Sequence, residues 1–175
     1  MITAEYPQVT LLRMPRNVGY GGAWSAGLTY ALGQGCDWVW TFDGDSVPQP
    51  HALAALLDGV GMAGSDENVG IIVGLPVNAE TDRCYAPQLW REGFQKVPTE
   101  VLSQPVWYAD LAIASGSMVR RDVVDKVGLP RTDLFLDFTD FEYCLRVRSE
   151  GYKIAVVTAG VMRAGVPAKL AADRR

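Results

Sequence analysis

The sequence predicts an α/β protein in which helices flank a mostly parallel β-sheet. Short apolar segments alternate along the chain with segments of helical composition, and this alternation is typical of parallel sheets. Residues 37–42 and 69–73 are apolar on both faces, as strands covered by helices on both sides must be. The chain has 175 residues, so we expect residues 1–175 to form one domain with a sizeable core.

The first half of the chain contains three apolar segments that favour strands. They are residues 9–12, 37–42 and 69–73. Residues 17–22 are expected to form a loop, and helical composition follows at residues 23–32 and 52–57. Gly33 and Gly35 are expected to end the first helix, because glycine readily adopts the conformation found just beyond a helix C-terminus.

The second half returns to the sheet after a long irregular segment. Residues 76–110 contain prolines and scattered charges without periodicity, and long segments of that kind are usually functional or disordered. A strand, two helices and a last strand are then predicted at residues 112–119, 121–127, 141–149 and 154–157. We expect residues 158–175 to form a C-terminal tail.

Composition argues against several classes of protein. Hydrophobic residues make up 49% and charged residues 21%, which is typical of a globular domain, and the net charge of -4 argues against a nucleic-acid partner. Three cysteines without a CxxC pair and a single histidine argue against a zinc site and favour a cytoplasmic protein. No apolar run approaches the roughly 20 residues needed to cross a bilayer, whereas contact with the inner membrane face stays open. The sequence does not indicate an oligomeric state.

Two carboxylates, Asp43 and Asp45, follow directly after the strand predicted at residues 37–42. Residues i and i+2 of an extended chain point the same way, so both can aim at one point beyond the strand end. Ligands of open α/β sheets bind at this edge, and paired carboxylate oxygens suit Mg²⁺ or Mn²⁺. The alternative is an ordinary turn, because Asp-Gly-Asp-Ser-Val-Pro is also good turn chemistry.

A second acidic cluster precedes and begins the helix predicted at residues 141–149. Thr139 and Glu142 have the spacing of a capping box, in which Glu142 would be a cap partner, and Asp140 could interact with the helix dipole. Asp137 adds a third acid within six positions, which exceeds what a cap needs. The excess indicates a carboxylate with a chemical role, such as accepting the proton of an attacking sugar hydroxyl.

Four motifs in a fixed order resemble the family-2 glycosyltransferases of GT-A fold, a Rossmann-like fold. The motifs are Asn17-x-Gly19, Asp43-x-Asp45, Ser115-Gly116, and Thr139-Asp140 with Arg146. Within that family, the segments around Asp43 and Asp140 most resemble the branch of rhamnosyltransferases and galactofuranosyltransferases, which acts on polysaccharide or cell-wall glycans. The resemblance covers residues 9–157.

The resemblance implies a metal-dependent, inverting transferase. Asp43 and Asp45 match the DxD motif, which holds Mg²⁺ or Mn²⁺ and the ribose and diphosphate of a nucleotide-diphosphate sugar. Asp140 matches the general base that takes the proton from the attacking hydroxyl of a glycan or lipid-linked acceptor. In this mechanism the metal neutralises the leaving diphosphate, and the acceptor oxygen attacks the opposite face of the anomeric carbon.

Five further positions receive a donor-binding role from the same resemblance. Asn17 and Gly19 match the loop beside the nucleotide. Ser115 and Gly116 match a segment that lines the pocket for the donor sugar and the acceptor, where glycine lets substrate approach the backbone. Arg146 matches an arginine that steadies the catalytic acid or the phosphates.

Two departures from the family pattern leave other interpretations open. The first nucleotide-binding strands of the family have no counterpart here, and Arg163 stands where members often carry a histidine metal ligand, although arginine cannot ligate a cation. The chain could therefore be a non-catalytic, truncated remnant of such a transferase. A third interpretation is a dinucleotide-dependent oxidoreductase, because residues 19–24 partly match a dinucleotide fingerprint in which Trp24 is too large for the last position.

Aromatic residues allow both structural and binding roles. Trp38 and Trp40 lie two positions apart on a predicted strand, so both face one side of the sheet and packing is expected. Trp90, Trp107 and Tyr108 lie in the irregular segment, where they could stack on sugar rings or pack in the core.

Overall fold

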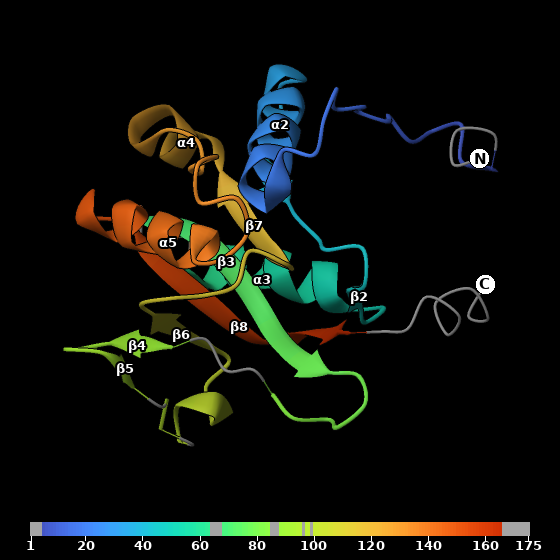
Figure 1. The fold of residues 1–175 in the computed structure, drawn as a ribbon. Coiled ribbons are helices and arrows are strands. Elements are labelled where there is room, and N and C mark those ends of the chain that lie inside the picture. Colours follow the sequence, from blue (N-terminus) through green and yellow to red (C-terminus); the bar gives the residue numbers. More distant parts are fainter. Residues whose placement is uncertain (1–4, 64–67, 85–87, 96, 99, 166–175) are drawn as a thin grey trace.

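The computed structural model describes residues 5–63, 68–84, 88–95, 97–98 and 100–165. Its six-stranded sheet has the order β1-β7-β3-β8-β2, with β6 also paired to β8 (Figure 1). The strands of this sheet are β1 (Trp38–Trp40), β2 (Val47–Pro48), β3 (Val69–Asn78), β6 (Val106–Ala109), β7 (Ser117–Arg120) and β8 (Lys153–Ala164). The helices are α2 (Gly19–Gly33), α3 (Ala52–Ala63), α4 (Arg121–Val127) and α5 (Thr139–Ser149). Between β3 and β6, the chain forms a hairpin of β4 (Leu89–Trp90) and β5 (Phe94–Gln95) and the 3₁₀ helix η1 (Val101–Ser103).

The α/β class is confirmed, and the sheet is mixed. β3 and β8 pair in parallel. β1 and β3 also run in the same direction, but each pairs antiparallel with β7, which lies between them. β2 and β6 run antiparallel to β8. The principal strands β1, β3 and β8 are therefore parallel, as predicted, whereas most neighbouring strands of the described chain pair antiparallel.

Alternating side chains of the central strands divide the core into two layers. On β3, Ile71 and Val73 belong to the cluster that α2, α4 and α5 cover, whereas Ile72 belongs to the cluster that α3 covers. Figure 1 shows the corresponding arrangement of these helices around the sheet. Trp38 and Trp40 both pack against the α3 cluster, which confirms the predicted common side. Nowhere in the described ranges is a helix both long enough and apolar enough to cross a membrane.

Two predicted elements near the N-terminus differ from the structure. Residues 9–12 form no strand, and Val9 is 45% exposed. A strand needs a neighbouring strand as partner for its backbone hydrogen bonds, and this segment has none in the described chain. α2 begins at Gly19 and so includes most of the loop predicted at residues 17–22. α4, in contrast, has the predicted bounds, and Gly128 ends it with a φ of 86°.

Both segments predicted without regular structure contain strands. Within residues 76–110, β3 continues to Asn78, and β4, β5, η1 and β6 follow. The tail predicted at residues 158–175 begins later, because β8 continues to Ala164; residues 166–175 lie outside the described part of the chain. Both strands extend this far because they pair with each other, and Asn78 and Ala164 are the last partners of their parallel ladder.

Candidate functional site

Residues 43–46 form a turn that also presents two carboxylates. The backbone N–H of Ser46 donates to the carbonyl of Asp43 at 3.1 Å, which closes a β-turn shortly after β1. Asp43 and Asp45 are both exposed, and both line a cavity of about 670 Å³. The turn that the sequence offered as an alternative is therefore present, and the same segment carries both carboxylates of the predicted metal site.

Ser115 holds this turn in place. Its buried hydroxyl accepts a hydrogen bond from the backbone N–H of Asp43 at 3.0 Å and donates one to Ser46 Oγ at 2.9 Å. The N–H of the next residue, Gly116, donates to the carbonyl of Thr41 at 2.6 Å. The loop before β7 is thereby attached to the chain directly after β1, and its position sets the position of the carboxylate turn.

The structure explains glycine at position 116 by packing. Gly116 has a φ of +79°, a conformation that residues with a side chain rarely adopt. A Cβ atom there would lie 2.1 Å from the side chain of Met162, and the Gly116 carbonyl accepts a hydrogen bond from Trp40 Nε1 at 3.1 Å. The close approach of a substrate to this backbone stays a prediction.

Two cavities meet at the carboxylate turn. The first has a volume of about 500 Å³, lies between α2 and the β1 end, and is lined mainly by apolar and aromatic side chains that include Tyr20. The second, of about 670 Å³, is lined by Asp43, Asp45 and Ser115 on one side and by Phe141 of α5 on the other. Asp43 lines both cavities, so a ligand that occupied both would pass over its carboxylate.

The charge of Asp43 raises the pKa of two other ionisable groups, Asp140 and Tyr20. Partial burial raises the pKa of Asp43, the charge of Asp45 raises it further, and the hydrogen bond with Ser115 lowers it. Burial also raises the pKa of Asp140; backbone N–H groups partly offset this, and the charge of Asp43 adds to the increase. Burial raises the pKa of Tyr20, and the charges of Asp43 and Asp140 contribute. The charge of Asp43 thus acts on Asp140, although Asp140 itself lines neither of the two cavities.

Asp140 lies in the first turn of α5, which begins without a side-chain cap. The residue at the cap position is Phe138, whose φ of 62° is left-handed. The predicted capping box is wrong, because Thr139 is buried and Glu142 bonds to another side chain. Asp140 Oδ1 instead accepts the N–H of Phe141 at 2.9 Å. A left-handed conformation costs a residue with a side chain about 1–2 kcal/mol, and strain of this kind is concentrated at functional sites.

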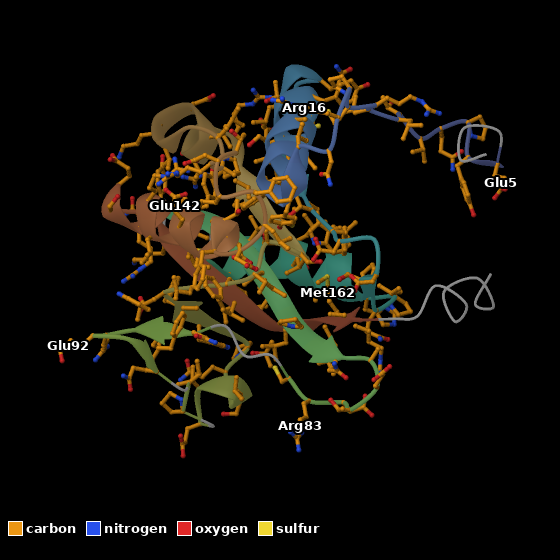
Figure 2. The ribbon with its side chains drawn as sticks, in the orientation of Figure 1. Glu5, Arg16, Arg83, Glu92, Glu142 and Met162 are labelled. Carbon is orange, nitrogen blue, oxygen red and sulfur yellow. The ribbon has the colours of Figure 1, made fainter. Side chains whose placement is uncertain are left out.

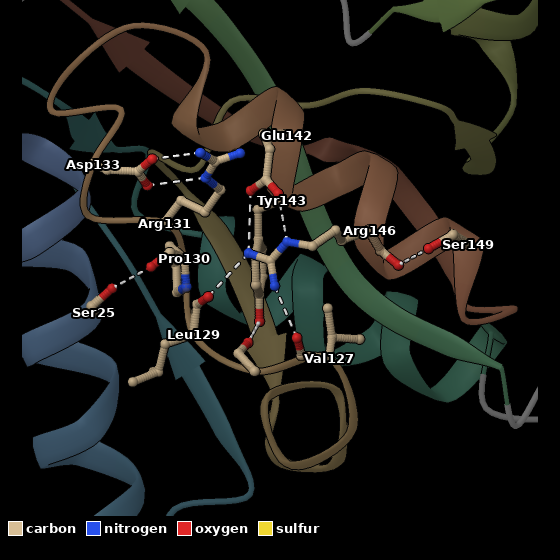
Figure 3. A network of polar contacts seen from close by, with 11 residues as sticks. Ser25, Val127, Leu129, Pro130, Arg131, Asp133, Glu142, Tyr143, Arg146 and Ser149 are labelled. Carbon is tan, nitrogen blue, oxygen red and sulfur yellow. Dashed lines mark hydrogen bonds and ion pairs between the residues drawn. The ribbon is translucent and has the colours of Figure 1, made fainter.

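The structure gives Arg146 a supporting position. Its guanidinium donates to both carboxylate oxygens of Glu142, at 2.6 and 3.1 Å. It also donates to the carbonyls of Val127 and Leu129, which connects α5 to the end of α4 (Figure 3). These contacts hold the helix that carries Asp140, and they differ from the expected contact with the phosphates or with that acid.

Asn17 and Gly19 shape the start of α2. Asn17 Oδ1 accepts the N–H of Gly19 at 2.9 Å. Gly19 has a φ of +70°, and a Cβ atom there would lie 2.4 Å from the carbonyl oxygen of Phe135. Glycine thus lets residues 131–138 cross the helix start, beside Tyr20. Asn17 and Gly19 do not line either of the two cavities, so the structure brings them near the site and not into it.

Asp43 and Asp45 fit a hydrated divalent cation. Their mutual repulsion, which contributes to the raised pKa of Asp43, would be relieved by a positive charge. Mg²⁺ commonly takes only one or two carboxylates and keeps several waters. Across the described ranges, no group of three or more His, Cys, Asp or Glu side chains is arranged to hold a metal. Arg163, at the position of the family's histidine, forms an ion pair with Asp82 at 2.8 Å.

Two residues near the carboxylate turn were not predicted from the sequence. Tyr20 lies on α2, where the charges of Asp43 and Asp140 help to raise its pKa, and Ser46 Oγ accepts a hydrogen bond from the Ser115 hydroxyl. The sequence carried a weak signal for each, because Tyr20 directly follows the Asn17-x-Gly19 motif and Ser46 directly follows the Asp-Gly-Asp segment.

The three aromatic residues of the irregular segment have separate positions. Trp107 is 4% exposed and belongs to the core. Tyr108 is exposed on β6, with Lys153 Nζ lying 5.2 Å from its ring centroid. Trp90 is exposed on β4, where its ring contacts that of Phe94.

A known family and two curated relatives match most of the chain. The family described as Glycosyl transferase family 2 matches residues 1–128. dTDP-rhamnosyl transferase RfbF of Shigella flexneri is 27% identical over 157 residues, which cover 88% of this chain and 51% of that protein. Galactofuranosyltransferase GlfT1 of Mycolicibacterium smegmatis is 27% identical over 161 residues, which cover 86% and 51%. The chain thus spans about half the length of these relatives.

A solved structure has a similar fold. GalNAc-T7, crystallised with UDP, GalNAc and Mn²⁺, aligns with a TM-score of 0.68 over 93% of this chain and 33% of that chain. The sequence identity is 15%, so the likeness concerns the fold. It confirms the GT-A-like fold that the motifs predict.

Proposed function

The chain belongs to glycosyl transferase family 2, and we propose that it transfers a sugar from a nucleotide-diphosphate sugar to a glycan or lipid-linked acceptor. The observation that carries this proposal is the carboxylate turn, whose Asp43 and Asp45 line one cavity. Asp140 supports it, because burial raises its pKa and the charge of Asp43 adds to the increase. The oxidoreductase interpretation loses its basis, because residues 19–24 lie within α2 and Trp24 packs on Tyr143.

Asp43 and Asp45 would hold Mg²⁺ or Mn²⁺, which supplies positive charge to a leaving diphosphate when it is bound. We place the nucleoside on the α2 side, where Asn17 and Gly19 shape the helix start and aromatic residues line the first cavity. The transferred sugar would then lie in the second cavity, beside Ser115. The shared position of Asp43 between the cavities supports this arrangement.

Asp140 is the proposed general base. A carboxylate whose pKa is raised by burial is a stronger base than an ordinary one, which suits it to accept a hydroxyl proton. As Asp140 takes this proton, the acceptor oxygen bonds to the anomeric carbon, and the bond from that carbon to the diphosphate breaks on the opposite face. The configuration inverts. Asp140 lies beyond the family-matched residues 1–128, so its proposed role rests on its burial and on the charge of Asp43 that acts on it.

Calorimetric titration of UDP, dTDP and GDP with and without Mn²⁺ tests the donor site. We expect binding that depends on Mn²⁺ and that weakens at least tenfold in Asp45→Asn. The matched control is Asp58→Asn, which changes an exposed acid on α3 and should leave binding unchanged. A lack of nucleotide binding in the unaltered protein would favour the non-catalytic remnant. The names of the relatives make rhamnose and galactofuranose the first sugars to test.

A further inference from the structure

Four aromatic rings form a row, and one of its inner members lines the second cavity. That member is Phe141. Its ring centroid lies 5.8 Å from that of Phe94, which in turn lies 5.0 Å from that of Trp90. On the other side, the ring of Phe138 lies 6.3 Å from that of Phe141. We call these four residues the aromatic row.

Three members of the aromatic row are open to solvent. Trp90 is 40%, Phe94 50% and Phe138 63% exposed. The angles between neighbouring ring planes range from 57° to 86°, so the rings do not stack face to face on one another. Single exposed aromatics are common, but a contiguous exposed group beside a cavity marks a binding surface.

The hairpin of β4 and β5 is fixed to the helix that carries Asp140. Trp90 and Phe94 are cross-strand partners in this hairpin, and Phe94 contacts Phe141 of α5. The backbone N–H of Trp90 donates to Asp110 at 2.7 Å, and Asp110 forms an ion pair with Arg148 of α5 at 2.6 Å. This polar bridge and the ring contact between Phe94 and α5 hold the row before any ligand arrives. A preorganised surface loses less conformational entropy on binding.

We propose that the aromatic row binds the acceptor and that the acceptor is a glycan, whose successive sugar rings lie on Phe141, Phe94 and Trp90. The proposal rests on the proposed function, in which the attacking hydroxyl lies at Asp140, the residue before Phe141. An extended acceptor that reaches from Asp140 into the second cavity then passes Phe141, which lines that cavity and contacts Phe94. The apolar faces of sugar rings suit aromatic side chains, which combine a large contact area with few rotatable bonds.

A membrane surface is the other possible partner and fits these residues less well. Surfaces that bind the membrane interface combine aromatic residues with Lys and Arg. Here Asp137 directly precedes Phe138, and Glu92 lies at the tip of the hairpin (Figure 2). Arg91 is the basic neighbour of Glu92, and the chain as a whole carries a net charge of -4. The charges around the row therefore favour a neutral, hydroxyl-rich ligand.

Saturation-transfer NMR with a rhamnose trisaccharide and a galactofuranose trisaccharide, in the presence of Mg²⁺ and dTDP, tests the proposal. At least one trisaccharide should bind, and Trp90→Ala and Phe94→Ala should each raise its dissociation constant at least fivefold. Trp90→Phe keeps a ring and should stay within about twofold of the unaltered protein. Tyr30→Ala removes an exposed aromatic residue from α2, away from the row, and should change nothing.

Three results would overturn the proposal. The first is that neither trisaccharide binds, and the second is that both alanine variants bind as tightly as the unaltered protein. The third is that the protein sediments with vesicles of phosphatidylglycerol and phosphatidylcholine and that the alanine variants lose this binding. Metal-dependent binding of dTDP, measured on the same samples, separates this inference from the proposed function. If dTDP binds normally and the row has no effect on the trisaccharides, only the acceptor inference fails.

Discussion

Replacing Ser115 with alanine should loosen the carboxylate turn. The side chain is 3% exposed and makes two hydrogen bonds, accepting from the Asp43 N–H at 3.0 Å and donating to Ser46 Oγ at 2.9 Å. A hydrogen bond contributes about 1 kcal/mol net, and a buried donor left without an acceptor costs about 1–3 kcal/mol. Water can reach the exposed turn and replace part of these bonds, so we expect the free energy of unfolding to fall by about 1–2 kcal/mol.

The same substitution should weaken metal-dependent nucleotide binding. If about 1.4 kcal/mol of the loss appears in binding, the dissociation constant of Mn²⁺ and UDP rises about tenfold. The Ser115 side chain also lowers the pKa of Asp43, so the substitution should raise that pKa. A cation needs the ionised carboxylate. As the pH is lowered, metal-dependent binding should therefore be lost at a higher pH in the variant than in the unaltered protein.

Urea unfolding and calorimetric titration between pH 5 and 8 measure both effects. The control is Ser149→Ala, which removes an exposed hydroxyl that donates to the Arg146 carbonyl on the far end of α5. Lower stability with unchanged nucleotide affinity would refute the coupling of Ser115 to the carboxylates. An unchanged stability together with unchanged affinity would refute the hydrogen-bond argument itself.

Three further substitutions test separate parts of the site. Gly116→Ala forces a side chain into the left-handed region and against Met162, so thermal unfolding should show a loss of roughly 2–4 kcal/mol. Asp140→Asn should abolish transfer yet raise the free energy of unfolding at pH 7. Burial raises the pKa of Asp140, so the stability that its protonated form contributes is lost as the pH rises through that pKa, and asparagine avoids this loss. Urea unfolding at pH 3, where Asp140 is protonated, should show a smaller gain. Arg146→Lys breaks the paired contact with Glu142 and should cost about 1.5–3 kcal/mol in urea unfolding, with unchanged affinity for Mn²⁺ and UDP; a parallel loss of affinity would place Arg146 in the donor site.

Local signals in the sequence identified the elements that local forces determine. The bounds of α4 follow from its own residues and from Gly128, and the turn at Asp43 follows from turn-forming residues directly after a strand. Residues 9–12 show the limit of such signals, because an apolar segment becomes a strand only beside another strand. The position of β7 between β1 and β3 depends on contacts distant in sequence, so the order of strands along the chain could not predict it.

The candidate site likewise combines features that neighbouring residues determine with features that depend on contacts distant in sequence. The carboxylates Asp43 and Asp45 could be predicted because two residues of one turn supply them. The capping box could not be tested from spacing alone, since its failure depends on the burial of Thr139 and on the pairing of Glu142 with a residue one helical turn later. The aromatic row was also hidden, because it joins β4, β5 and α5 through contacts that sequence periodicity does not describe.

α5 connects the two halves of the proposed site. It carries Asp140, on which the charge of Asp43 acts, packs Val147 into the core, and holds the β4–β5 hairpin through Arg148 and Asp110. The donor carboxylates are held separately, by Ser115 on the loop before β7. Damage to the hairpin should therefore weaken acceptor binding without affecting the donor, and damage at Ser115 should do the reverse. The two halves meet at the second cavity, which is lined by Asp43 and Asp45 and by Phe141 of the aromatic row.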